Sequence, residues 1–363
     1  MSATSDQLLQ ALAAVTDPNT GKDFVSTKAM KNLQVNDGNV SFDVELGYPA
    51  RSQIPALRNA MIAAAKGVPG VQNVSVNMTS RIVAHSAQRG VALLPKVKNI
   101  VAVASGKGGV GKSTMAVNLA LALAAEGAAV GLLDADIYGP SLPMMMGIEG
   151  RPESADGKSM EPLENYGVQV MSIGFLVAQD EAMIWRGPMA TQALEQLLRQ
   201  TNWNDLDYLI VDLPPGTGDI QLTLSQRVPM TGAVIVTTPQ DIALLDAKKG
   251  IKMFEKVGVP ILGIVENMAV HVCSKCGHAE HIFGEGGGQR MAAEYGMDYL
   301  GALPLDIRIR EQADSGKPTV VSDPDGEIAG IYKAVARQVA IKIAAKAKDF
   351  SSKVPSIKIS KET

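Results

Sequence analysis

Short apolar runs recur along the chain from residue 100 onward, and segments with helical periodicity separate each run from the next. Each run is apolar on successive residues, so a strand formed by it would be buried on both faces. Strands of this kind joined by helices form a mostly parallel sheet flanked by helices. The predicted strands are 100–105, 130–134, 168–173, 207–212, 233–238, 261–267 and 298–304. This part of the chain is therefore expected to have an α/β fold.

A different pattern fills residues 1–84. It combines two helical segments with three strands, two of them joined by an Asp-Gly turn, and predicts a small α+β domain. Residues 85–98 contain Pro95 and several basic side chains without a sustained period, which indicates a linker. The α/β domain is expected at 99–348, and a flexible tail at 349–363.

The composition excludes several classes of protein. The 363 residues, 46% of them hydrophobic, suffice for two domains with cores of their own. A net charge of -3 gives no overall cationic field, so neither nucleic acid nor a stable membrane association is expected. The first residues lack the basic and apolar regions of a secretory signal, and the richest apolar stretch, 115–125, is too short to span a bilayer. We therefore expect a cytoplasmic protein.

The segment GKGGVGKST, residues 106–114, lies between the first of these strands and a helical segment. It satisfies the phosphate-loop pattern G-x-x-x-x-G-K-[ST], and a strand before it with a helix after it is the context that pattern requires. Its glycines let backbone N–H groups turn toward the phosphates of ATP, Lys112 reaches the terminal phosphates, and the Ser113 hydroxyl is placed to coordinate Mg²⁺. The expected nucleotide contacts are Gly106, Gly108, Gly109, Val110, Gly111, Lys112, Ser113 and Thr114.

Carboxylates follow two of the predicted strands. Asp134 and Asp136 stand at the end of one strand and Asp212 at the end of another, so all three are expected at the carboxyl edge of the sheet, where open α/β sheets bind ligands. Asp212 is the candidate to hold Mg²⁺, directly or through water, and Asp136 to position the attacking water. Asp134 is equally consistent with a helix cap.

The only two cysteines, Cys273 and Cys276, stand two residues apart in the segment CSKC. Together they can bind one metal, but a zinc ion or an iron–sulfur cluster usually takes four protein ligands. Two chains meeting at this segment would supply four sulfurs, which suits a bridging [4Fe–4S] cluster or a Cys₄ zinc. The alternatives are a zinc site within one chain completed by His271, His278 or His281, a redox dithiol, and inert structural cysteines.

The lysine-rich phosphate loop resembles that of a known class of enzymes. KGGVGK is similar to the deviant Walker A motif of the MinD, ParA, nitrogenase iron protein and Mrp class of dimeric P-loop ATPases. The resemblance implies a homodimer in which Lys107 crosses the interface to a phosphate on the facing subunit; the alternative is a solvated loop lysine. The segments TTPQDIALLDAKKG and VENM also resemble this class, which implies Asp246 as a cross-dimer partner of Lys107 and Asn267 as an adenine contact.

Two further segments resemble one family within that class. DLPPGTGD at 212–219 and NMAVHVCSKCGHAEHIFGEGGG at 267–288 are similar to the Mrp/ApbC family, and the match runs in order over about residues 98–345. The resemblance implies a slow ATPase that carries an iron–sulfur cluster, with Cys273 and Cys276 as cluster ligands. It also implies iron–sulfur assembly proteins and apo-protein clients as partners.

Residues 1–84 resemble the SufT-like domain that precedes the ATPase in many bacterial Mrp proteins. In stand-alone relatives a cysteine follows a proline at the position where this chain has Pro49, Ala50, Arg51 and Ser52. Thiol chemistry is therefore excluded here, and the domain is expected to dock partner proteins or to be purely structural.

Two other functions compete with the cluster carrier. One is a MinD/ParA-like positioning ATPase whose last helix, about 328–350, lies on a membrane surface. The other is a P-loop ATPase with a structural zinc at its dimer interface. A positioning ATPase has no use for CSKC, whereas the sequence leaves the zinc alternative open, and the choice between [4Fe–4S] and [2Fe–2S] as well.

Overall fold

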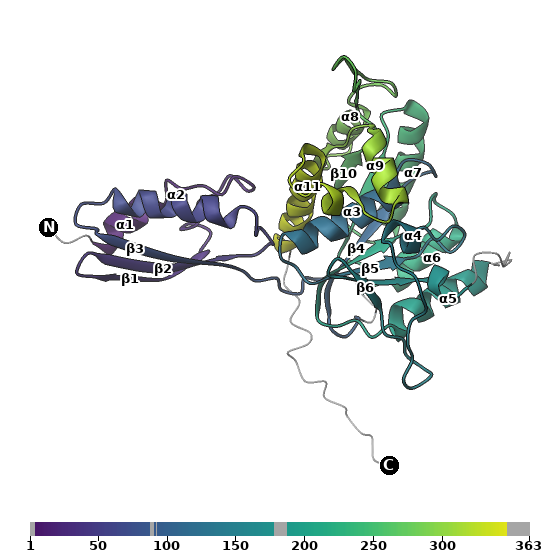
Figure 1. Ribbon diagram of the computed structural model, residues 1–363, viewed down its shortest axis with the longest axis horizontal. Helices are drawn as coiled ribbons and strands as arrows, with labels where there is room; N and C mark the ends of the chain where they lie inside the picture. Colours follow the sequence, from purple (N-terminus) through teal and green to yellow (C-terminus); the bar gives the residue numbers. More distant parts are fainter. Residues whose placement is uncertain (1–3, 88–90, 92, 178–186, 347–363) are drawn as a thin grey trace, which may run out of the picture.

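The computed structural model describes residues 4–87, 91, 93–177 and 187–346, so the predicted tail at 349–363 lies outside the described residues. A small sheet and a large sheet form, each covered by helices (Figure 1). The large sheet has eight strands in the order β13-β10-β9-β4-β8-β5-β7-β6. All neighbouring strands are parallel except β6 and β7. The predicted mostly parallel α/β fold is confirmed.

All seven predicted strands of this sheet are present. The eight strands of the sheet are β4 (Val97–Ala104), β5 (Val130–Asp134), β6 (Leu163–Asn165), β7 (Val168–Ser172), β8 (Leu206–Asp212), β9 (Gly232–Thr237), β10 (Ile261–Glu266) and β13 (Tyr299–Ala302). The central strands β4, β8, β9 and β10 are buried along nearly their whole length, as their continuous apolar sequences require. The sequence did not predict β6, a three-residue antiparallel edge strand.

Helices cover both faces of the large sheet (Figure 1). They are α3 (Lys112–Ala125), α4 (Leu142–Met145), α5 (Gly187–Gln200), α6 (Asp219–Arg227), α7 (Asp241–Lys256), α8 (Gly287–Glu294), α9 (Ile307–Asp314), α10 (Thr319–Ser322) and α11 (Glu327–Ala344), with a 3₁₀ turn at Ile173–Phe175. α3 is buried at every residue from Met115 to Leu123, which fits a helix that is apolar on all sides.

The last helix, α11, packs against α3 and β13. Its buried face includes Tyr332, Val335, Ala336 and Val339, so the apolar residues of this helix are used inside the protein. In the part of the chain that the structure describes, we find no helix with the length and hydropathy needed to cross a bilayer.

The small sheet matches the predicted α+β pattern. β2 (Asn39–Leu46) lies between β1 (Met30–Asn36), which is antiparallel to it, and β3 (Asn73–Ser80), which is parallel to it. Asp37 and Gly38 both have positive φ, 45° and 79°, as a two-residue hairpin turn requires. Helices α1 (Ser5–Leu12) and α2 (Ile54–Lys66) contribute Leu8, Leu12 and Met61 to the core.

A polar cluster around Glu126 joins this small unit to the large one. Glu126 follows α3, and its carboxylate is fully buried. Arg337 of α11 donates to Oε1 at 2.6 Å, and Ser52 donates to the same oxygen through its hydroxyl at 2.6 Å and to Oε2 through its backbone N–H at 3.0 Å. The backbone N–H of Arg51 donates to the Glu126 carbonyl at 3.1 Å. Arg51 and Ser52 therefore form the N-terminal side of this contact.

Replacing Arg337 by alanine is expected to destabilise the protein. The substitution leaves the buried Glu126 carboxylate without its counter-charge, and breaking a buried ion pair costs about 3 to 5 kcal/mol. Denaturant unfolding measures the change in the free energy of unfolding. The matched control is Arg310→Ala, which removes exposed ion pairs to Glu311 and Asp314 and should cost at most about 1 kcal/mol. Equal unfolding midpoints for the two variants would contradict the role of Glu126.

Candidate functional site

The phosphate loop connects the end of β4 to the start of α3, as the sequence predicts. Gly111, the N-cap of α3, has φ of 82°, and a Cβ there would lie 2.1 Å from Nδ2 of Asn267. A Cβ on Gly106 would lie 2.1 Å from the carbonyl carbon of Asp246. Both positions therefore admit only glycine. The N-terminal N–H groups of α3 point toward the loop and make it a binding site for anions.

Lys112 brings the predicted catalytic groups together. Its ammonium is 6% exposed and lies 2.5 Å from Oδ1 of Asp212 and 3.8 Å from Oδ2 of Asp136. It also donates to the hydroxyl of Ser113 at 3.2 Å. Residues from β4–α3, β5 and β8 thus converge at the carboxyl edge of the sheet. The other predicted contacts occupy the same loop: Gly108 and Gly109 are exposed, Thr114 is half-buried and Val110 is buried.

Asp212 fits the role of a magnesium ligand. Its side chain has no solvent exposure, and its Oδ2 is buried without a hydrogen-bond partner among the described residues. Burial raises the pKa of this carboxyl, and the ammonium of Lys112 opposes the rise. Magnesium prefers carboxylate and hydroxyl oxygens, which Asp212 and Ser113 offer side by side next to Lys112. The residues present therefore suit Mg²⁺.

Asp134 has a structural role. It is fully buried and accepts hydrogen bonds from the N–H groups of Leu142 and Asp136, each at 3.2 Å, and from the Ser172 hydroxyl at 3.0 Å. Burial and then the charge of Asp212 raise the pKa of Asp134. Leu142 is the first residue of α4, whose N-cap is Ser141, so Asp134 binds the start of this helix from the end of β5. Burial also raises the pKa of Asp136, against the opposing charge of Lys112.

The segment DLPPGTGD lies beside the phosphate loop. The backbone N–H of Leu213 donates to the carbonyl of Val103 at 3.1 Å, and that of Gly216 donates to the carbonyl of Ser105 at 3.0 Å. Gly216 has φ of 95°, which the turn after two prolines needs. A change in the conformation of this segment would therefore act directly on Val103 and Ser105, which lead into the phosphate loop.

Lys107 and Asp246 are not paired within one chain. Lys107 is half-buried, and no carboxylate in the described ranges forms an ion pair with it. Asp246 instead accepts from Lys249 at 2.9 Å, while its backbone packs against Gly106. Their pairing across a dimer stays a prediction.

Asn267 contacts the phosphate loop, which sequence reasoning missed. It follows β10, is 7% exposed, and donates from Nδ2 to the carbonyl of Val110 at 2.9 Å. Its predicted contact with adenine stays a prediction. No local pattern indicates the contact with Val110, because 157 residues separate the two positions.

The two cysteines occupy the turn of a short hairpin formed by β11 (His271–Val272) and β12 (Ala279–Glu280). This is the green segment that projects between β10 and α8 at the top of Figure 1. Cys273 is half-buried and Cys276 is exposed. Hydrogen bonds from the backbone N–H groups of Lys275 and Cys276 lower the pKa of the Cys273 thiol. A lowered pKa favours the thiolate, which is the form that binds metal.

Two histidines near the cysteines form hydrogen bonds to backbone carbonyls. His281 Nδ1 lies 2.7 Å from the carbonyl of Ala269, and His271 Nδ1 lies 3.0 Å from the carbonyl of Leu305. Carbonyl oxygens only accept, so these ring nitrogens carry the protons. Across the described ranges, no three His, Cys, Asp or Glu side chains are grouped to hold a metal. Within the described ranges, the two sulfurs therefore have no third side chain grouped with them.

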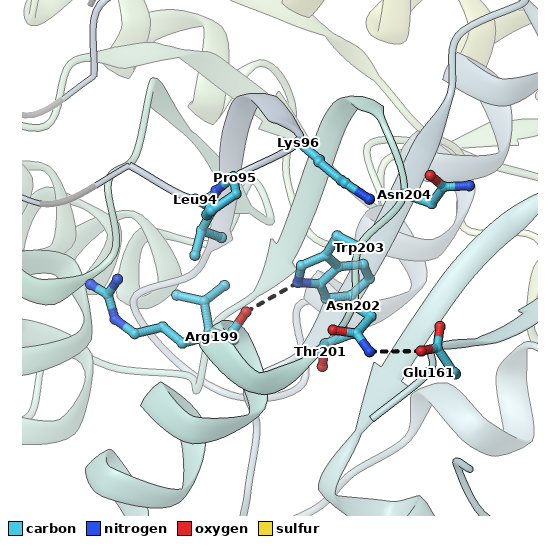
Figure 2. Close-up of a pocket in the computed structure, with 10 residues that line it drawn as sticks. Leu94, Pro95, Lys96, Glu161, Arg199, Thr201, Asn202, Trp203 and Asn204 are labelled. Carbon is cyan, nitrogen blue, oxygen red and sulfur yellow. Dashed lines mark hydrogen bonds between the residues drawn. The ribbon is translucent and has the colours of Figure 1, made fainter. Parts of the chain in front are cut away.

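A pocket lies at the other edge of the sheet (Figure 2). Its lining comes from residues 94–96, which precede β4, and from residues 198–204, which precede β8, together with Glu161. In Figure 2 the indole of Trp203 lies among the lining residues, held by its hydrogen bond to the carbonyl of Leu198 at 3.1 Å. The phosphate loop follows the opposite ends of these strands, so this pocket is separate from the nucleotide site.

Two families match the chain. Residues 96–340 match the family described as NUBPL iron-transfer P-loop NTPase, and residues 5–77 match the family described as iron-sulfur cluster assembly protein. The chain is 50% identical over 347 residues to an iron-sulfur cluster carrier protein of Escherichia coli strain K12, covering 94% of each. It is 56% identical over 245 residues to the iron-sulfur cluster transfer protein NUBPL of Mus musculus, covering 67% of this chain and 77% of that one.

Solved structures agree with the fold. A nucleotide-binding protein of Archaeoglobus fulgidus in complex with ADP is 38% identical, with a TM-score of 0.56, over 64% of this chain and 90% of that one. MinD of Pyrococcus horikoshii complexed with Mg-ADP has a TM-score of 0.51 at 22% identity, over 68% of this chain and 99% of that one. The second likeness shows the fold alone, and the MinD/ParA-like fold predicted from the sequence is confirmed.

Replacing Lys112 by alanine is expected to lower nucleotide hydrolysis by about 100-fold or more, because the phosphates lose their buried positive charge. Release of inorganic phosphate measures the effect. The matched control is Lys98→Ala, since Lys98 forms an ion pair with Asp207 at the other edge of the sheet. Hydrolysis at the wild-type rate in the Lys112 variant would remove this lysine from the site.

Proposed function

Because this chain belongs to the NUBPL iron-transfer P-loop NTPase family, we propose that it is a slow ATPase that carries an iron–sulfur cluster and transfers it to apo-proteins. The observation that carries the proposal is the cysteine hairpin, which presents two thiols a few residues beyond a strand end that contacts the phosphate loop. The printed names of the Escherichia coli and mouse relatives support the same cargo.

In the nucleotide site, Lys112 exchanges its ion pair with Asp212 for contacts with the phosphates. Lys112 forms an ion pair with Asp212 at 2.5 Å. When ATP occupies the loop, Lys112 turns to the terminal phosphates, and Asp212 with Ser113 becomes free to hold Mg²⁺. Mg²⁺, when bound, neutralises charge on the phosphates. Asp136, 3.8 Å from Lys112, is then placed to orient the attacking water.

The cluster is cargo shared between two copies of the chain. Each copy offers Cys273 and Cys276, and a cluster takes four ligands, so a homodimer supplies the set for one [4Fe–4S] cluster. Lys107 fits the same arrangement, because within the described residues of one chain its ammonium meets no carboxylate and is available for a phosphate on the facing copy.

The remaining assignments concern partners and domains. We place a domain boundary in the linker 85–98, between a docking domain at 1–84 and the ATPase domain at 99–348. Assembly proteins that donate the cluster and apo-proteins that accept it are the partners this role requires. A positioning ATPase on a membrane is disfavoured, because the apolar face of α11 packs against α3.

Anaerobic reconstitution with iron and sulfide tests the cargo. Wild type should bind about one cluster per two chains with broad visible absorbance, and Cys276→Ala should bind none. The counts of iron, sulfide and zinc per chain decide the result. Ser274→Ala, in the same turn, is the control and should bind as wild type does. Zinc without sulfide would replace the carrier by an ATPase with a structural metal.

Mixing two inactive variants tests whether Lys107 acts across the dimer. Lys107→Ala and Lys112→Ala should each fail to hydrolyse ATP. A mixed dimer restores one site, which combines Lys112 of one copy with Lys107 of the other. An equal mixture that exchanges freely should therefore recover about a quarter of wild-type activity. A mixture as inactive as its components would mean that Lys107 acts within its own chain or has no role.

A further inference from the structure

Asn267 holds one particular peptide of the phosphate loop. Its Nδ2 donates to the carbonyl of Val110, and a Cβ on Gly111 would lie 2.1 Å from that nitrogen. The carbonyl of Val110 and the N–H of Gly111 belong to the same planar trans peptide and point in opposite directions. With the carbonyl turned to Asn267, the N–H is turned away from it, on the side where a phosphate loop binds its anion. The position of Asn267 is therefore tied to the orientation of a phosphate-binding peptide.

The same side chain also holds the chain that leads to the cysteines. Oδ1 of Asn267 accepts from the N–H of Met268 at 3.0 Å. Met268 has φ of 59°, a left-handed conformation that a non-glycine residue rarely adopts. A residue held in such a conformation depends on its neighbours for support. Loss or movement of the contact with Asn267 thus acts on a backbone position that is already strained.

The cysteine hairpin is fastened to the next residues. Ala269 donates its N–H to the carbonyl of Leu303 at 3.0 Å, and its own carbonyl accepts from the ring of His281 at 2.7 Å. His281 follows β12, so this bond ties the returning arm of the hairpin to the strand end beside Met268. A movement of residues 267–269 would therefore be passed to the cysteine hairpin through the bond between the Ala269 carbonyl and His281.

We propose that Asn267 and His281 are positioning residues that couple occupancy of the phosphate loop to the placement of Cys273 and Cys276. The inference rests on the proposed function, since it assigns regulation to the same cysteine pair. Phosphate binding fixes the Gly111 N–H, Asn267 follows the peptide, and residues 268–269 move the hairpin through His281. Nucleotide then selects between two placements of the thiols.

Alkylation of the cysteines in cluster-free protein tests the coupling. The rate is measured with iodoacetamide in the absence of nucleotide and with saturating Mg²⁺ and a non-hydrolysable ATP analogue. For wild type, nucleotide should change the rate about fivefold or more, which is within the usual range of coupling between sites. His281→Ala should bind the analogue as wild type does and show equal rates in both conditions.

Two further variants separate coupling from damage to the hairpin. His281→Asn offers an amide N–H close to the position of Nδ1 and should restore the response to nucleotide. His278→Ala removes an exposed ring from the same hairpin and should respond as wild type does. Asn267→Asp, which lacks the N–H group that reaches Val110, should lose the response at saturating analogue.

The outcomes distinguish this coupling from simple shielding of the thiols. Protection of the thiols by dimer formation alone would leave the response of His281→Ala intact and would overturn the inference. An unresponsive wild type would overturn it as well. Because no cluster is present, either result leaves the test of the cargo unaffected. A chain that responds to nucleotide but binds no cluster would instead remove the proposed function.

Discussion

The ammonium of Lys112 lies 2.5 Å from the carboxylate of Asp212, and both groups are shielded from water. Removing two charges from water costs free energy that their mutual attraction repays only when the geometry is good. The geometry is good here because the phosphate loop and the end of β8 meet at one edge of a buried parallel sheet, which holds the two charged groups 2.5 Å apart. Asp212 still keeps one oxygen without a partner among the described residues, and that oxygen is suited to bind a cation.

α3 connects this site to the rest of the molecule. It begins at Lys112 in the phosphate loop and is followed by Glu126, whose buried carboxylate binds Ser52 and Arg337. The small N-terminal unit therefore contacts the end of the helix that is farthest from the nucleotide. Arg51 and Ser52 supply the N-terminal side of this contact.

In the described part of one chain, the cysteine hairpin has too few ligands for a metal or a cluster. Two exposed or half-exposed thiols have no third ligand grouped beside them in the described ranges, and in the proposed carrier they supply half of the cluster's ligands. The rings of His271 and His281 hold backbone carbonyls through Nδ1, and neither ring is grouped with the two sulfurs in the described ranges. In the proposed dimer, a second copy supplies the other two sulfurs. The bonds of Asn267 and His281 form a short route from the phosphate loop to the cysteine hairpin.

The sequence by itself determined the features that local patterns encode. Continuous apolar runs specified seven strands of the large sheet, and spacing within nine residues specified the phosphate loop, because burial and loop conformation act on neighbouring residues. Elements of two or three residues, such as β6, β11 and β12, carry too little periodicity to be read in this way. Only the tertiary structure decided that Asp134 binds the first N–H of α4, that Glu126 joins the two units, and that Asn267 holds Val110 across 157 residues. Such contacts follow from how strands and helices pack in space, and no local pattern in the chain records which distant residues will meet.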